Sequence, residues 1–345
     1  MDASNPDSLV KTRFLIISDT HGARCLPGND RLLGPVDVAI HCGDLTEESK
    51  LAEFRATLEL MKSIRAPLKL VIAGNHDWTL DTPMFKKKIA EIPPPVDMEL
   101  VRREYGDIGE AQRILQASAK NEGEDNDESG IIFVDEGTHT FTLSNGASLT
   151  LFASPYTPST DDWGFQYDAR GGHQWDVQGD VDVVVTHGPP EGVMDRTATG
   201  SRIGCPSLFA AVARAKPRLH CFGHAHRGWG AKLARWRGGE AVGSPVSHFE
   251  AFDNDRSVVV ETLAGLTPRD FDGPDAVAEK RRRLEARTAA GCFATSHCAG
   301  DEHPLRKGEG TLFVNAAIQG DGKQPQHLPW VVDIELPRAP RDAAA

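Results

Sequence analysis

Five short motifs combine carboxylate, amide and imidazole side chains, and each follows an apolar stretch of the chain. They are Asp-x-His at 19–21, Gly-Asp at 43–44, Gly-Asn-His-Asp at 74–77, Thr-His-Gly at 186–188 and Gly-His-Ala-His at 223–226. Such oxygen and nitrogen donors suit manganese, iron and zinc, and a shared carboxylate permits two ions about 3.5 to 4 Å apart. The sequence therefore predicts a two-metal site in which Asp44 is the natural bridging ligand.

Each motif alone is a weak signal, because a single histidine after a strand is more often a hydrogen-bonded core or surface group than a ligand. Five motifs in this order, each closing an apolar run, make a coincidence improbable. Glycines beside the ligands, at Gly43, Gly74, Gly188 and Gly223, would let metal and phosphate approach the backbone closely. We assign the remaining histidines, including His41 and His220, to structural roles.

The elements that must position these motifs follow an α/β order. Apolar runs at 13–18, 36–41 and 68–73 alternate with a helix-like stretch at 49–64, and further strands are expected at 131–134, 138–143, 148–153, 181–187, 217–224, 311–318 and 330–336. Helices are expected within 82–119, at 205–215 with Pro206 in the first position, and near 275–287. Two sheets are favoured over one, with the chemistry at the strand ends.

The composition indicates one large domain. The chain has 345 residues, of which 39% are hydrophobic and 26% charged. We predict a single domain over 1–345 with its core at about 12–234 and 311–337. The segment 235–310 is interpreted as an insertion of unknown role that could bind a protein partner, and the acidic segment 121–130 as an exposed loop.

The net charge and the lengths of the apolar runs argue against nucleic-acid binding and against membrane insertion. A formal charge of -12 offers no basic face for a duplex backbone, so a nucleic-acid partner is not expected. Apolar runs stay far below the roughly 20 residues of a membrane span, and the first ten residues lack a secretory signal, so a cytoplasmic protein without membrane contact is expected. The six cysteines are interpreted as reduced. Cys292 and Cys298 match no common zinc spacing.

The five motifs resemble those of the calcineurin-like metallophosphoesterase superfamily over residues 13 to 230. The likeness is greater still to its metallophosphoesterase-domain (MPPED-like, fetal-brain 239 type) branch, which shares ISDTHG, GDLTE, IAGNHD, WGF, THGPP, IGCPSL, PRLHCFGHAHRGWG and VNAA. The resemblance implies a four-layer αββα sandwich of two mixed β-sheets flanked by helices. It also implies a hydrolase, with phosphodiesterase activity on small or nucleotide-like substrates, including cyclic nucleotides.

Carried over residue by residue, the resemblance implies one metal held by Asp19, His21, Asp44 and His226. The other would be held by Asp44, Asn75, His187 and His224. Manganese is the first candidate for both ions, with iron, zinc, magnesium or nickel as alternatives. The segments 235–310 and 121–130 depart from the branch.

The expected mechanism uses a hydroxide that bridges the two metals and attacks phosphorus in line. His76 is the expected general acid for the leaving group. Glu47 could orient His76 and keep it charged. Asp77 could do the same, although we favour a helix cap for this residue because it precedes the stretch WTLDTPMFKK.

The substrate is suggested by what the motifs lack. GDLTEES and AGNHD carry no arginine, whereas protein phosphatases of the superfamily use arginines there to clamp a dianionic monoester. A less positive site favours a diester. Arg202 and Arg227 could partly replace the clamp, and Trp163, Phe165 and Trp229 are candidates to stack on a base.

Three alternatives remain at this point. A protein or small-molecule phosphomonoesterase is the nearest rival, and a nuclease is disfavoured by the acidic charge. The third belongs to another class, a metal-binding regulatory or scaffold protein with little turnover, because motifs do not report placements of about 0.5 Å.

Overall fold

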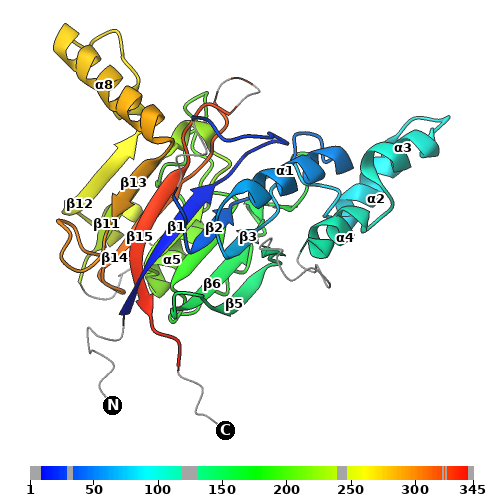
Figure 1. Ribbon diagram of the computed structural model, residues 1–345. Helices are drawn as coiled ribbons and strands as arrows, with labels where there is room; N and C mark the ends of the chain where they lie inside the picture. Colours follow the sequence, from blue (N-terminus) through cyan, green and yellow to red (C-terminus); the bar gives the residue numbers. More distant parts are fainter. Residues whose placement is uncertain are drawn as a thin grey trace.

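Two mixed β-sheets form the centre of the molecule, and helices cover their outer faces (Figure 1). The computed structural model describes residues 9–28, 34–118, 130–238, 247–320, 322 and 325–340. The strand runs expected from the sequence are present, and each of the five motifs follows a strand. The α/β order is therefore confirmed.

The first sheet has six strands in the order β13, β15, β1, β2, β3, β4. Their bounds are Phe293–Ser296, Trp330–Pro337, Leu9–Ile17, Val38–His41, Leu68–Val71 and Ile131–Phe133. Strands β1 to β4 run parallel, and β15 pairs antiparallel with β1. The carboxyl ends of β1, β2 and β3 consequently lie at one edge of this sheet.

The second sheet has seven strands in the order β12, β11, β14, β10, β9, β6, β5. Their bounds are Phe252–Thr262, Gly230–Trp236, Gly310–Asn315, Leu219–Phe222, Val183–Thr186, Ser148–Ser154 and Gly137–Thr142. Strands β14, β10, β9 and β6 are parallel. A short pair, β7 (Thr157–Pro158) and β8 (Gln166–Tyr167), encloses the segment 159–165.

The core consists of three apolar layers. Alternate residues of β1 face opposite ways: Phe14 and Ile16 join the layer between the sheets, while Leu15 and Ile17 join the layer beneath the helices on the other side. A third layer lies between the second sheet and a helix at 206–215. The expected αββα sandwich is confirmed.

Helices cover the outer faces. Their bounds are α1 Leu51–Ser63, α2 Thr82–Glu91, α3 Met98–Tyr105, α4 Glu110–Ala117, α5 Pro206–Ala215, α6 His248–Ala251, α7 Leu263–Leu266 and α8 Pro274–Ala290, with a 3-10 turn η3 at His226–Gly228. Helix α1 buries Phe54 and Met61 against the first sheet. Helix α5 begins as expected, with Pro206 in its first turn and the Cys205 sulfur accepting a hydrogen bond from the Leu208 amide.

The segment 235–310, which we interpreted as an insertion, contributes strands to both sheets. Strand β12 pairs with β11 at the edge of the second sheet, and β13 pairs with β15 at the edge of the first. Between them α8, which has no buried residue, extends from the body (Figure 1). The segment therefore widens both sheets, a result that local sequence pattern misses because both pairings join strands distant in the chain.

Two other expectations were an exposed loop at 121–130 and the absence of a membrane-spanning segment. Apart from Gly130, the acidic segment lies outside the described residues. Across the part of the chain that the structure describes, every helix is too short or too polar to cross a bilayer.

Candidate metal centre

The predicted ligands come together where strands of both sheets end. Asp19 and His21 follow β1, Asp44 follows β2, and Asn75 follows β3. From the second sheet, His187 follows β9, and His224 and His226 follow β10. Because parallel strands present their carboxyl ends at one edge, residues as far apart in sequence as Asp19 and His226, separated by 207 positions, become neighbours.

The first group of donors comprises Asp19, His21 and His226, whose ligand atoms all lie within 4.8 Å of one another. His226 Nε2 is 3.1 Å from Asp19 Oδ1. The backbone N–H of His224 donates to the Asp19 carboxylate at 3.1 Å, so this aspartate ties the two sheets together.

The second group comprises Asp44, His187 and His224, again within 4.8 Å of one another. His187 Nε2 lies 3.3 Å from Asp44 Oδ1 and 2.9 Å from the side-chain oxygen of Asn75. His21 Nε2 is 3.8 Å from Asp44 Oδ2, so Asp44 touches both groups. All seven predicted ligands are therefore assembled, with Asp44 between the two groups as expected.

The tautomers of two histidines make this arrangement suitable for cations. His21 Nδ1 faces the carbonyl of Thr46 at 3.1 Å, and His187 Nδ1 faces the carbonyl of Cys42 at 2.9 Å. Since a carbonyl only accepts, each Nδ1 carries a proton, and Nε2 is the nitrogen that would bind a metal once it has lost its own proton. His21 Nε2 is buried and has no hydrogen-bond partner among the described residues, as a metal-ligating nitrogen would require. The residues present fit two divalent ions.

The backbone is strained at several ligands. Asp19, His21, Asp44 and His224 have φ values of 56°, 46°, 53° and 63°, a region that residues other than glycine seldom adopt. Such conformations persist only where the surroundings impose them, and they concentrate at functional sites. The fold thus holds four of the seven predicted ligands in backbone conformations of unfavourable free energy.

Two glycines permit the close approach of loops that bear ligands. A Cβ on Gly74 would lie 2.3 Å from the backbone nitrogen of Asp44, and one on Gly223 would lie 2.1 Å from an Asp19 carboxylate oxygen. Neither contact is possible for a real side chain. At both positions the absence of a side chain lets the ligand loops pack together, whereas the expectation concerned the approach of metal and phosphate.

The electrostatics of the site attract positive charge. Burial opposes ionisation of Asp44, but the charges of His187 and His76 outweigh it and hold its pKa well below the usual value. Burial lowers the pKa of His187, yet Asp44 raises it to about 9. His21 likewise reaches a pKa of about 9, since its Glu47 hydrogen bond and Asp44 outweigh burial. Two buried carboxylates thus favour counter-charge, supplied by protons or by divalent cations.

His76 projects from the loop after Asn75, and its orientation is fixed from two sides. Its Nδ1 donates to the backbone carbonyl of Glu47 at 2.7 Å, which leaves Nε2 available. The Glu47 carboxylate lies 3.1 Å from His21 Nδ1. The Glu47 carbonyl thus orients His76, and the Glu47 carboxylate also lies within 4.8 Å of a ring nitrogen of His76.

The Asp77 expectations are corrected. Asp77 is fully buried and accepts hydrogen bonds from the amides of Leu45, Thr46 and Gly74 and from the Thr46 hydroxyl. The cap of α2 is Asp81, which accepts from the Met84 amide. Asp77 thus joins the Asp44 and Asn75 loops, and Pro83 in the first turn of α2 was the sequence signal for the later cap.

The residues expected to contact the substrate differ in their burial and in their distance from the site. Trp229 is 1% exposed, stacks on Trp330 and donates to the Leu328 carbonyl, so its assignment as a base-stacking residue is wrong. Trp163 packs on the ring of His76, and Arg202 pairs with Asp195 at 2.8 Å. Arg227 is exposed beside His226.

Further residues support the ligand loops: His41 and His220, which we expected to be structural, and Asn315, whose role the sequence did not indicate. His41 Nε2 lies 2.8 Å from the Thr20 hydroxyl, between the ligands Asp19 and His21. His220 Nε2 lies 2.9 Å from the Thr186 hydroxyl, beside His187. Asn315 donates to the Ala225 carbonyl at 2.9 Å and so holds the loop of His226. Asn315 lies in the VNAA motif that this chain shares with the family branch, but the motif did not indicate what the residue does.

The sequence comparisons agree with this geometry. The model of the calcineurin-like phosphoesterase family matches residues 12–228, and the chain belongs to that family. Metallophosphoesterase domain-containing protein 1 of Homo sapiens is 30% identical over 239 residues, which are 66% of this chain and 64% of that protein. A probable rhamnogalacturonate lyase C of Emericella nidulans is 31% identical over 232 residues, or 67% of this chain and 18% of that protein. The chain thus matches less than two thirds of either relative.

Among solved structures, a purple acid phosphatase from yellow lupin is similar over 66% of this chain and 39% of its own. The TM-score is 0.33 and the sequence identity 12%.

Proposed function

We propose that the protein is a hydrolase of phosphodiesters with small or nucleotide-like alcohols, including cyclic nucleotides. The observation that carries this proposal is the meeting of two donor groups at Asp44, with the unpartnered Nε2 of His21 directed into the site. When bound, two divalent ions, manganese first among them, would lower the pKa of a water molecule and offset charge on the phosphoryl group.

The chain's own residues would supply the remaining steps. His76 Nε2 is free to donate a proton to the departing alkoxide, because Nδ1 is held by the Glu47 carbonyl. The stack with Trp163 restricts rotation of the imidazole. A general acid contributes about 10²- to 10⁴-fold when the leaving group is poor.

Preference for a diester is supported by the charges around the site. The loops that carry Asp44 and Asn75 contain no arginine, and Arg202 is already paired with Asp195. A monoester dianion would therefore lack the arginines that protein phosphatases carry in these two loops. A singly charged diester needs less counter-charge.

The test is hydrolysis of bis-p-nitrophenyl phosphate against p-nitrophenyl phosphate by protein stripped of metal and reloaded with manganese. We expect faster turnover of the diester, loss of that turnover on chelation, and subsequent activity on 2′,3′- or 3′,5′-cyclic mononucleotides. Preference for the monoester would indicate a phosphatase. No turnover with any divalent metal would favour the regulatory alternative.

A further inference from the structure

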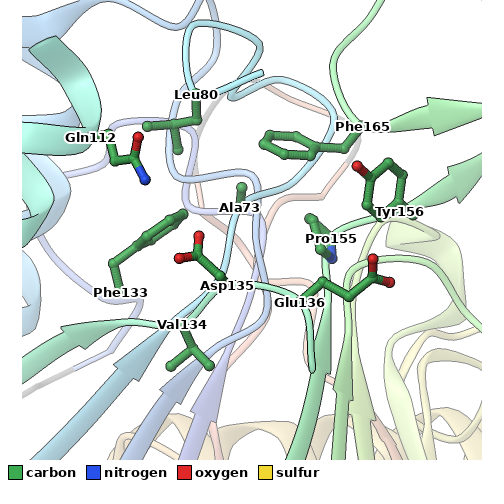
Figure 2. A pocket seen from close by; sticks show the side chains of 10 residues that line it. All are labelled: Ala73, Leu80, Gln112, Phe133, Val134, Asp135, Glu136, Pro155, Tyr156 and Phe165. Carbon is green, nitrogen blue, oxygen red and sulfur yellow. The ribbon is translucent and has the colours of Figure 1, made fainter. Parts of the chain in front are cut away.

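A cavity of about 160 Å³ lies one strand further along both sheets than the metal centre. Figure 2 shows the side chains that line this cavity. It forms where β3, β4 and β6 end, at Ala73, Asp135 and Pro155. None of its lining residues is a predicted metal ligand. The cavity is therefore distinct from the donor groups, although it shares their edge of the sandwich.

The walls of this cavity differ in chemistry. Leu80 and Phe165 lie on one side, the carboxylates of Asp135 and Glu136 lie on the opposite side, and Tyr156 stands next to Glu136 (Figure 2). No basic side chain is among the lining residues. An anionic occupant would face the carboxylate of Asp135 and find no basic side chain in the lining, so a second phosphate site is disfavoured.

The charges around the cavity point to a cationic occupant. Asp135 has no ion pair among the residues that the structure describes, and Glu136 pairs with His173 at 2.7 Å. Burial raises the pKa of Tyr156, and the charges of Glu136 and Asp81 raise it further, as a negative local potential requires. An ammonium group here would lie near these carboxylates and next to the aromatic side chains of Tyr156 and Phe165.

The dimensions limit the size of that occupant. A cavity of roughly 150 Å³ is known to hold a benzene ring, so this one can hold a single ring or a trimethylammonium group. The cavity also lies close to the predicted metal ligands. Ala73 lines the cavity and Asn75 is a ligand two residues later, so their Cα atoms are at most about 7 Å apart.

A backbone contact links the two sites. The Gly164 amide donates to the Asn75 carbonyl at 2.9 Å. On either side of Gly164, the ring of Trp163 packs on His76 and Phe165 lines the cavity. A group seated against Phe165 would thus lie close to the loop that carries both a ligand and the proposed acid.

We infer that this cavity binds a small organic ammonium group and selects phosphodiesters that carry such a group on one alcohol. The second half of the inference rests on the proposed phosphodiesterase activity, whereas binding of the ammonium group does not. Asp135 and Glu136 supply the charge selection, and Tyr156 and Phe165 supply the aromatic contact.

Two substrates that differ only in charge test the selection. p-Nitrophenyl phosphocholine and 3,3-dimethylbutyl p-nitrophenyl phosphate share a leaving group and nearly the same shape. We expect kcat/KM to favour the choline ester at least about tenfold, mainly through KM, as for one charge-assisted contact. In Asp135→Asn and Glu136→Gln the ratio should approach one. Equal rates for the two esters in the unmodified protein would overturn the selection.

Glu99→Gln is the matched control, because it removes one exposed carboxylate outside the cavity and should leave the ratio unchanged. A similar fall of the ratio in this control would assign the effect to overall charge and contradict the cavity. Calorimetric titration with phenyltrimethylammonium tests the cavity separately from turnover. Binding that Asp135→Asn weakens supports the cavity even if bis-p-nitrophenyl phosphate is not hydrolysed, and absence of binding overturns it.

Discussion

The ring of Trp163 lies against the ring of His76, with centroids 4.2 Å apart and an angle of 30° between the planes. Together with the hydrogen bond from Nδ1 to the Glu47 carbonyl, this contact fixes where His76 Nε2 points. The segment that carries Trp163 is held in turn by ion pairs of Asp162 with Lys87 and Lys88.

Replacing Trp163 with alanine should therefore impair protonation of poor leaving groups. We expect kcat for an alkyl phosphodiester to fall by about tenfold, a part of the full effect of a general acid, while bis-p-nitrophenyl phosphate changes little. Trp163→Phe, which keeps an aromatic face, should recover most of the rate. Equal losses on both substrates would mean that Trp163 acts on stability or binding instead.

Gly164 should not tolerate a side chain. Its Cβ would lie 2.7 Å from the Trp78 Cα, and a backbone atom cannot move away easily. Gly164→Ala should lower the free energy of unfolding by about 1 to 3 kcal/mol, as overpacking commonly does. Urea denaturation measures this change. Gly171→Ala, where the nearest atom is an ordinary 3.5 Å away, is the control and should be nearly neutral.

Asp77 should matter for stability and for metal affinity together. Asp77→Ala leaves the amides of Leu45, Thr46 and Gly74 buried without their acceptor, at about 1 to 3 kcal/mol for each unsatisfied group. We expect a lower melting temperature and weaker manganese binding by calorimetry, because the two loops would separate. Unchanged metal affinity in a folded variant would contradict the proposed link between the loops.

His220 should make the protein less stable in acid. Burial lowers its pKa from about 6.5 to about 3 in the folded protein. Between these values the unfolded chain binds a proton that the folded chain excludes, so stability falls as the pH decreases, by about 1.4 kcal/mol per pH unit. His220→Gln should flatten the dependence of the unfolding free energy on pH from 6.5 downwards.

The positions of the metal ligands could be predicted because each ends an apolar strand, and strand order alone brings such ends to one edge. Asp19 and His224 illustrate this, since they meet across the two sheets at 3.1 Å. The type of each donor is visible in the sequence, and the family resemblance implied how the donors would be divided between two ions.

The roles of neighbouring residues could not be predicted in the same way. Glu47 acts on His76 through its carbonyl, which every residue type possesses, so its identity carried no information. Trp229 lies between two glycines next to a site motif, and the sequence does not say whether its ring faces the site or the core. Strands β12 and β13 join the sheets through long-range pairings.

The most direct test of the two-metal account is a manganese titration of the stripped protein with bis-p-nitrophenyl phosphate as substrate, beside Asp44→Asn. We predict that activity rises until two ions are bound per chain, and that the variant loses an ion and falls by at least about 10²-fold. Full activity without metal, or an Asp44→Asn variant as active as the unmodified protein, would contradict the account.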